Sequence, residues 1–332
     1  NNGRKGYCEP RVETQKVKAT IGDHDEFKAY AARVAALYAK WRKAHEPLLK
    51  GLKVNDKPKD VIHTLSEDLL IRFADVPLLD RYDVYQRLMD YWEEVMQDDV
   101  YLIAADGWKD AARPRAVIDD KERKIKETPD LTVKRKKYKM DLVPPALIVA
   151  RYFAKEQAAI DEAQASLDEA TRMLEEFVEE NTGEEGLLED ATNDKGKATK
   201  TGVNARLKEI GDDPEFADEQ KALEHCLKLL ETESLAKAAV KAVQEKLDKQ
   251  VLAQYPKLTE AEIKTLVIED KWLASIRTAI EGEVQRLTQR LAGRVRELEE
   301  RYAQPLPELE REVEAFSEKV ESHLKKMGLV WA

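Results

Sequence analysis

Apolar residues recur every three or four positions along most of the chain, which is the spacing of one face of an α-helix. In the N-terminal part this pattern predicts three helices, with Asp25, Asp56 and Asp80 placed to cap their first turns. Pro58 fits the first turn of the second helix, where a missing N–H costs nothing. The apolar positions of the three helices are Phe27, Tyr30, Val34, Leu37 and Trp41, then Val61, Ile62, Leu65, Leu69 and Phe73, then Val84, Leu88, Tyr91, Trp92 and Val95.

A short apolar run at residues 100–103 interrupts the helical spacing and is typical of a β-strand. Asp106-Gly107 follows it as a turn, and residues 116–118 are the expected partner strand of a small β-hairpin. Residues 121–139 are polar and basic, so we expect an exposed loop or sheet edge there.

Pro144 and Pro145 start a new helix, because proline is tolerated in the first helical turn and not beyond it. We therefore place a domain boundary before them. Residues 1–140 form a mixed helical domain with a small hairpin and a basic loop, and residues 141–332 form a long-helix, coiled-coil-like assembly domain.

The long-helix domain begins with a heptad pattern that needs a partner helix. Its apolar positions are Val149, Phe153, Ile160, Ala163, Leu167, Ala170, Leu174 and Phe177. A Gly- and charge-rich insertion at residues 181–213 follows, with a short helix expected at residues 203–210. A second arm then carries Leu223, Leu227, Leu230, Val240, Val243, Leu247 and Val251. The two arms predict an antiparallel helical hairpin with the insertion at its tip.

Two further long helices are expected after Pro256, the first restarted by a capping box of Thr259 and Glu262. Its apolar stripe, which we predict to contact a partner protein, comprises Leu273, Ile276, Ile280, Val284, Leu287, Leu291, Val295 and Leu298, and it continues to Tyr302. The eleven-residue repeat of this stripe calls for a nearly straight helix. Pro305 and Pro307 interrupt the pattern. A last helix carries Leu309, Val313, Phe316, Val320, Leu324 and Met327, with Gly328 as its C-cap.

The fold class is therefore expected to be mainly α, and the composition agrees. Of 332 residues, 42% are hydrophobic and 37% are charged, with 13 Gly and 12 Pro, which favours solvated helices over a turn-rich β fold. No apolar run approaches the ~20 residues that cross a bilayer, and no secretory leader follows the start. Two cysteines, Cys8 and Cys226, fit ordinary thiols in a reducing compartment. We expect a cytoplasmic protein with no membrane contact.

The formal net charge is -10, and its distribution matters more than its sum. Residues 161–190 hold twelve acidic residues against one base, Arg172. Lys134, Arg135, Lys136, Lys137 and Lys139 place five positive charges in six residues, with Lys121, Arg123, Lys124 and Lys126 just upstream. Such a cluster is suited to DNA phosphates, without a base-reading motif. A solvated loop explains it equally well.

Catalytic motifs are missing from the sequence. Neither GxGxxG nor GxxxxGK[ST] occurs, and the Pro144-Pro145 pair lacks the Asn and the aromatic residue of an adenine methyltransferase. Asp23-His24-Asp25 is better explained as an acidic helix start than as a metal site, and Asp98-Asp99 as a cap or solvated turn. Glu224-His225-Cys226 is adjacent on a helix, so its side chains diverge by about 100°. We expect no catalytic, cofactor-binding or metal residue.

Several segments together resemble the C-terminal half of the modification subunits of type I restriction-modification systems, and the likeness covers almost the whole chain. They are YQRLMDYWEEVMQDDVYLIAADGW at residues 85–108, DLVPP at 141–145, YPKLTEAEIK at 255–264, RYA followed by PLP within 301–307, and HLKKMG at 323–328.

The resemblance implies a function that spacing alone does not. Subunits of that family are N6-adenine DNA methyltransferases that use S-adenosylmethionine, and two copies assemble with one specificity subunit and, for cleavage, with restriction subunits. Their catalytic domain precedes the part matched here. Either this chain is a fragment, which the start at Asn1 without methionine favours, or the catalytic half is encoded elsewhere. We therefore expect no cofactor in this fragment, no catalysis by it alone, and docking on the specificity subunit with DNA in the assembled complex. The alternative is a stand-alone coiled-coil scaffold that self-associates.

Overall fold

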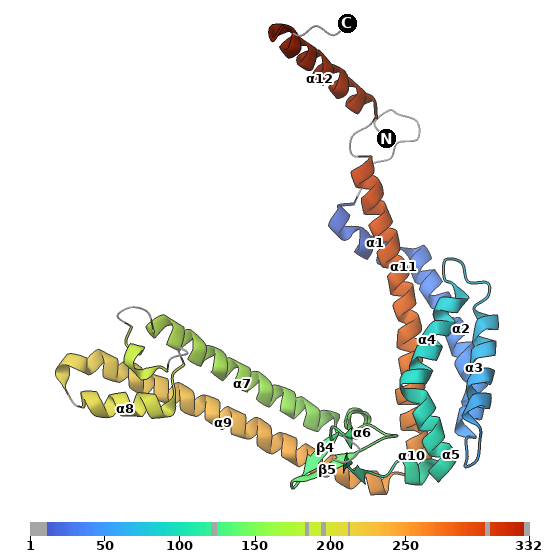
Figure 1. The fold of residues 1–332 in the computed structure, drawn as a ribbon. Coiled ribbons are helices and arrows are strands. Elements are labelled where there is room, and N and C mark those ends of the chain that lie inside the picture. The colour runs from blue at the N-terminus through green and yellow to red at the C-terminus, as the bar shows by residue number, and fades with distance from the viewer. Residues whose placement is uncertain are drawn as a thin grey trace. The chain divides into compact units, whose positions relative to one another are not determined.

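The computed structural model describes residues 12–120, 125–182, 186–193, 197–211, 213–302 and 306–328. This part of the chain is mainly helical, as expected, and contains a small three-stranded antiparallel sheet (Figure 1). Across it, no helix combines the length and the apolar character needed to cross a membrane.

The chain divides into two compact units, and the division differs from the expected boundary at residue 140. The first unit comprises Asn1–Leu52, Asp56–Val100 and Trp272–Ala332, and the second comprises Lys53–Asn55 and Tyr101–Lys271. The sequence boundary marks a helix start, whereas the chain passes between the units on either side of Lys53–Asn55 and inside two helical stretches. These are α5 (Gln97–Ala111) and the π-helical segment η6 (Thr265–Leu273).

The first unit is an all-helical bundle around α11. This unit also contains α1 (Val17–Asp23), α2 (Asp25–Lys50), α3 (Pro58–Arg72), α4 (Arg81–Tyr91), the π-helical turn η2 (Trp92–Met96) and α12 (Leu306–Lys326). Helices α1, α2 and α4 pack against α11 (Ala274–Arg301), and α3 packs against α2 and α4. A buried ion pair joins α4 to α11, since Glu283 lies 2.9 Å from Arg87 Nε and is 4% exposed.

Large aromatic residues fill the core of the first unit and place their polar atoms on acceptors. Tyr38 Oη donates to the Leu273 carbonyl at 2.5 Å, and Trp41 Nε1 donates to the Leu65 carbonyl at 3.0 Å. Trp272 Nε1 donates to Asp99 Oδ2 at 2.7 Å, with both residues buried. Each bond removes the cost of a buried, unpaired polar group.

Of the three expected helix caps in this unit, only Asp80 is confirmed, because its carboxylate accepts from Tyr82 N at 2.8 Å. The expectation for Asp25 was wrong: this residue is already helical, and His24 Nδ1 accepts from Glu26 N at 3.4 Å. The expectation for Asp56 was also wrong, since the N-cap of α3 is Lys57 without a side-chain cap bond. Pro58 is in the first turn, as predicted.

The predicted strand at residues 100–103 is helical, so the predicted hairpin with residues 116–118 does not form. Buried residues on α4, η2 and α5 recur at intervals of four and then three: Val84, Leu88, Trp92, Met96, Val100 and Ile103. Repeated spacings of four exceed the 3.6-residue period, and the π-helical turn η2 accommodates the drift. The predicted turn falls at a kink inside α5, where Gly107 has φ 76°.

The second unit is built around a long antiparallel pair of helices, α7 (Ala154–Asn181) and α9 (Ala217–Gln254), which confirms the predicted helical hairpin (Figure 1). The remaining helical segments are α6 (Pro145–Tyr152), η3 (Glu189–Ala191), α8 (Lys200–Ile210), η4 (Pro214–Phe216), η5 (Tyr255–Lys257) and α10 (Glu260–Lys264). Helix α6 starts at the proline pair, and α10 has the predicted capping box.

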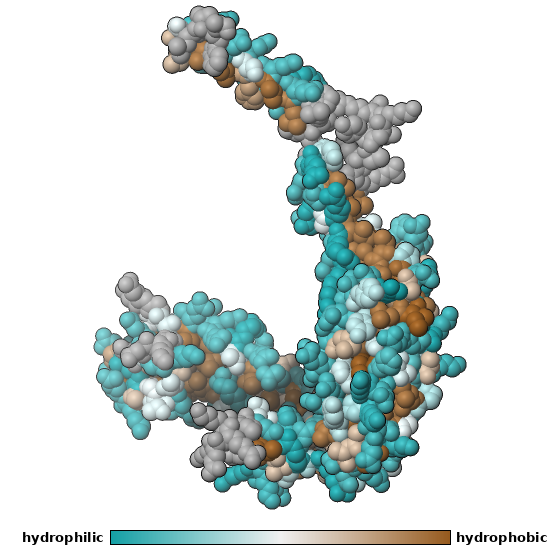
Figure 2. Space-filling model, turned by 45° about the vertical axis from the view of Figure 1, so that its right-hand side comes forward, coloured by the Kyte–Doolittle hydropathy of each residue, from teal (hydrophilic) through white to brown (hydrophobic). Residues whose placement is uncertain are grey.

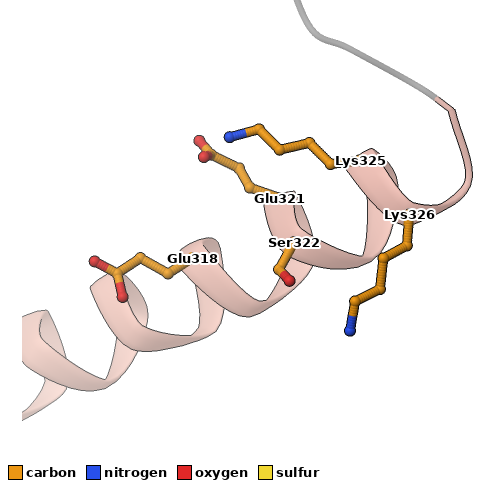
Figure 3. A pocket seen from close by; sticks show the side chains of 5 residues that line it. All are labelled: Glu318, Glu321, Ser322, Lys325 and Lys326. Carbon is orange, nitrogen blue, oxygen red and sulfur yellow. The ribbon is translucent and has the colours of Figure 1, made fainter.

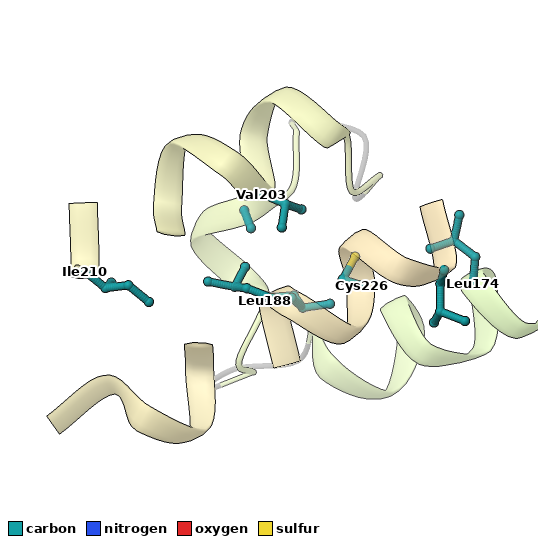
Figure 4. Close-up of a cluster of buried hydrophobic side chains, with 8 residues drawn as sticks. Leu174, Leu188, Val203, Ile210 and Cys226 are labelled. Carbon is teal, nitrogen blue, oxygen red and sulfur yellow. The ribbon is translucent and has the colours of Figure 1, made fainter. Parts of the chain in front are cut away.

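The described parts of the insertion at residues 181–213 pack on the tip of this pair and share a small core with it. Figure 4 shows Leu188 and Val203 from the insertion among Leu174 of α7 and Cys226 of α9. Leu188, Val203 and Cys226 are fully buried. The expected short helix at residues 203–210 is the last part of α8.

The sheet lies at the other end of the pair and has the strand order β1-β5-β4. Its strands are β1 (Arg115–Ala116), β4 (Leu131–Val133) and β5 (Lys136–Lys139), with Arg115 opposite Lys139 and Val133 opposite Lys136. A separate two-stranded pair joins β2 (Asp119–Asp120) to β3 (Ile125–Lys126).

Replacing Trp272 by Phe is expected to lower the free energy of unfolding by about 2–3 kcal/mol, because the buried Asp99 carboxyl group loses a donor. Trp41→Phe is the matched control. It removes the same indole N–H from a neutral backbone carbonyl and should cost about 1 kcal/mol less. Urea denaturation followed by circular dichroism measures both losses, and equal losses would contradict the role of the carboxyl group.

Candidate functional site

The basic cluster forms the end of a β-hairpin rather than an irregular loop. Strands β4 and β5 are joined by two residues, Lys134 and Arg135, whose φ angles are 49° and 66°. Positive φ at both central residues is the type I′ turn, which favours Gly because it has no Cβ and Asn because its short polar side chain hydrogen-bonds to the nearby backbone. Two long cationic side chains therefore occupy positions where glycine or asparagine would cost less.

Apolar contacts hold this basic hairpin, residues 131–139, against α9 of the same unit, and one ion pair closes its open end. Leu131 and Val133 are buried on one face of β4, which packs against α9. Lys139 Nζ lies 2.7 Å from Asp130 Oδ1, and Asp130 Oδ2 accepts from Met140 N at 2.8 Å. The strands therefore hold the turn in a defined position.

Four of the five predicted DNA-binding residues are available to a ligand. Lys134, Arg135, Lys136 and Lys137 are exposed, and none of them forms an ion pair with another described residue. Lys139 differs, because it is half-buried against Asp130. Upstream, Lys121, Arg123 and Lys124 lie outside the described residues, as does the side chain of Lys126.

A network of charges centred on Arg115 supports the hairpin from β1. Arg115 Nη2 donates to Glu127 Oε1 at 2.7 Å, and Arg115 Nε donates to Asp141 Oδ2 at 2.6 Å. The Arg115 guanidinium and the Ile118 N–H hold the pKa of Glu127 at about 2, and the two carboxylates raise the pKa of Arg115. No sequence signal indicated this network, because its members are separated by 12 and 26 residues.

The predicted partner stripe on α11 is divided between the core and the surface. Leu273, at the end of η6, and Ile276, Ile280, Val284 and Leu287 are buried within the first unit, in which α1, α2 and α4 pack against α11. Leu291 and Leu298 are each 37% exposed, Val295 is half-buried, and Tyr302 is 59% exposed. The first five residues thus belong to the chain's own core, and substitutions at Ile280 or Leu287 would perturb folding rather than test an interface.

The last helix exposes a second apolar stripe, which we call the α12 stripe. Apolar atoms run along one side of α12 in Figure 2. The stripe consists of Leu309, Val313, Phe316, Val320, Leu324 and Met327. The polar side carries an open surface lined by Glu318, Glu321, Ser322, Lys325 and Lys326 (Figure 3). These residues all come from one helix, so they enclose no ligand cavity.

The weaker chemical candidates have structural roles. Among the described residues, no group of three or more His, Cys, Asp or Glu side chains is arranged to hold a metal ion. The expected cap or solvated turn at Asp98-Asp99 is wrong for Asp99, which is buried in the helical run and accepts from Trp272. His225 packs edge-on against Phe177 at 4.7 Å between ring centroids, while Cys226 is buried.

Comparison with protein-family models, with curated proteins and with solved structures finds no match to the chain. Its function is therefore inferred from two surfaces, the basic hairpin and the exposed end of the α11 stripe.

Acidification is expected to loosen β1 and its neighbourhood before the helices unfold. The folded pKa of Glu127, about 2, lies below its ordinary 4.5, so its stabilising effect is complete above pH 4.5 and is lost as the pH falls towards 2. Hydrogen exchange at Ile118 N–H, which donates to Glu127 Oε2 at 2.8 Å, reports this change. In Glu127→Gln, protection at Ile118 should be weaker at neutral pH and should vary less in this window. Constant protection in the unsubstituted chain would contradict the assignment.

Proposed function

We propose that this chain is the C-terminal assembly region of a type I restriction-modification methyltransferase subunit, and that it docks on the specificity subunit through the exposed end of α11. The observation that carries the proposal is the division of the α11 stripe. The first half of the helix is fixed in a core, and the second half presents Leu291, Val295, Leu298 and Tyr302 outward at the same spacing.

The exposed end of α11 has the chemistry of a helix-binding surface. Its apolar residues recur at spacings of four, three and four, so a partner helix meets one continuous stripe. Complete burial of a leucine side chain stabilises by roughly 1.5–3 kcal/mol, and Leu291 and Leu298 have part of that still to gain. Because the preceding turns are anchored, little additional backbone ordering opposes the contact.

The family resemblance supplies the identity of the partner. In that family the catalytic domain carries the S-adenosylmethionine site and the adenine-gripping motif, and restriction subunits join for DNA cleavage. We propose that this chain contributes assembly and DNA positioning in the cytoplasm, without catalysis of its own. The alternative, a stand-alone coiled-coil scaffold, predicts self-association without selective binding of a specificity subunit.

The basic hairpin supports a second role, contact with DNA phosphates in the assembled enzyme. A residue other than glycine in the left-handed region of backbone conformation costs of order 1–3 kcal/mol of conformational free energy. Such a conformation persists where the surrounding structure fixes it. Here the two residues are Lys134 and Arg135, beside the exposed Lys136 and Lys137. The turn thus projects four cations without an ion-pair partner among the described residues. Contacts of this kind position DNA and carry no base sequence information.

Asp at Leu291 or at Leu298 is expected to weaken capture of the specificity subunit of the same system at least tenfold, because each charge would be placed in an apolar contact. Gly293→Asp is the matched control. It adds the same charge to the opposite face of α11, where a new Cβ meets no atom within 4 Å. Pull-down of co-expressed specificity subunit by the full chain gives the readout. Undiminished capture by folded Leu291→Asp and Leu298→Asp chains would refute the docking surface.

Replacing Lys134, Arg135, Lys136 and Lys137 by Ala is expected to reduce the salt dependence of duplex DNA binding by the assembled enzyme. The slope of log K against log salt should fall by roughly 2 to 4, since each phosphate contact contributes about 0.9. The control chain carries Ala at Lys208, Lys228, Lys241 and Lys246, four exposed lysines of the same unit. Fluorescence anisotropy at several salt concentrations measures the slope, and equal slopes for both chains would exclude the hairpin from the DNA contact.

A further inference from the structure

The α12 stripe is separate from the proposed docking surface. When the helix is reversed about Glu318, four of the six stripe positions coincide, and Val313 and Leu324 each lie one residue from the mirrored position. Between Leu309 and Met327 the stripe residues follow at intervals of four, three, four, four and three. In two copies packed antiparallel about Glu318, Leu309 of one copy lies opposite Met327 of the other, and Phe316 lies opposite Val320. The stripe is therefore complementary to itself in this orientation, as a two-fold interface requires.

Charges beside the α12 stripe change sign along the helix. Glu308, Glu312, Lys319, His323 and Lys326 each precede a stripe residue by one position, so all five lie about 100° to the same side. The first two are acidic, and the later ones include two lysines. In an antiparallel pair, the side of α12 that carries these charges faces the same side of the second copy, and the start of one helix lies beside the end of the other. Glu308 and Glu312 of each copy therefore approach Lys326 of the other. Parallel packing would instead place the acidic ends side by side.

Burial and length agree with such a pairing. Val313, Phe316, Val320 and Met327 are each more than half exposed, so the described chain leaves this apolar face uncovered. Helix α12 has 21 residues, which corresponds to about 30 Å of length. Isolated helices are marginal in water, and packing of an amphipathic face supplies most of the stability of a helix in a protein.

We propose that two copies of this chain associate through α12, antiparallel and centred on Glu318. The association uses a different helix from the docking surface on α11 and does not depend on the specificity subunit. The occupant of the α12 stripe is thus a second copy. Its apolar residues match the stripe, and its charges run from acidic to basic in the opposite direction when the two helices are antiparallel.

Sedimentation equilibrium of the full chain alone tests the proposal, with a concentration-dependent dimer as the expected result. Phe316→Asp should raise the dissociation constant at least tenfold, with circular dichroism confirming that the remaining helices are intact. Glu314→Lys with Glu318→Lys is the control, because both residues lie on the face away from the stripe. Its change in charge equals that of the Glu308→Lys and Glu312→Lys variant used to test the orientation.

Charge reversal tests the orientation. Glu308→Lys with Glu312→Lys, and separately His323→Glu with Lys326→Glu, should each weaken self-association at least tenfold, and an equimolar mixture of the two chains should form heterodimers. Stronger self-association of the first variant would show a parallel pair and overturn the proposal. A chain that is monomeric at all concentrations would also overturn it, while capture of the specificity subunit would still be decided by the α11 variants.

Discussion

Burial of the first half of α11 is the constraint on which the first unit depends. Leu273, Ile276 and Ile280 lie among helices that come from the opposite end of the sequence, and the Tyr38 hydroxyl ties α2 to the Leu273 carbonyl. Because a helix is stiff over tens of ångströms, fixing its first turns also fixes the direction in which its later turns emerge. Leu291, Leu298 and Tyr302 are therefore presented on a rigid support and not on a flexible tail.

In the second unit, the fold holds the like charges of the basic hairpin close together. The apolar residues of β4 and the Asp130–Lys139 pair hold the strands, and Arg115 links β1 to Glu127 and Asp141. These attractive contacts lie behind the turn, while the exposed cations at the turn have no such pairs among the described residues. Their mutual repulsion and the left-handed backbone at Lys134 and Arg135 are thus offset by contacts elsewhere in the hairpin.

The exposed surfaces divide into two chemical kinds. The end of α11 and the α12 stripe are apolar and fit helices of protein partners, whereas the basic hairpin fits phosphates. Long helices suit such a division, because one stretch can be buried within its own chain while the next remains available for assembly. The acidic stretch at residues 161–190 lies mainly on α7, in the same unit as the hairpin but in a separate element. At physiological salt, charges more than roughly 8 Å apart in solvent act largely independently.

The sequence by itself determined the helices, the antiparallel α7–α9 pair and several helix ends, including Asp80, the Thr259–Glu262 capping box and the proline pair. The helices and their ends depend on residues close together in the chain, where spacing and local hydrogen bonds decide the structure, and the pairing of α7 with α9 follows from the apolar stripe that each helix carries. The candidate basic residues were also visible as a cluster, although not as a type I′ turn. The strand predicted at residues 100–103 rested on four consecutive apolar residues, whereas only Val100 and Ile103, three positions apart on α5, are buried. Only the tertiary structure decided that Ile280 is core and Leu291 is surface, since both belong to one repeating pattern and the helices that cover Ile280 come from distant segments. The charge network of Arg115 and the Trp272–Asp99 hydrogen bond likewise join residues that only the fold brings together, so no local pattern in the sequence predicts them.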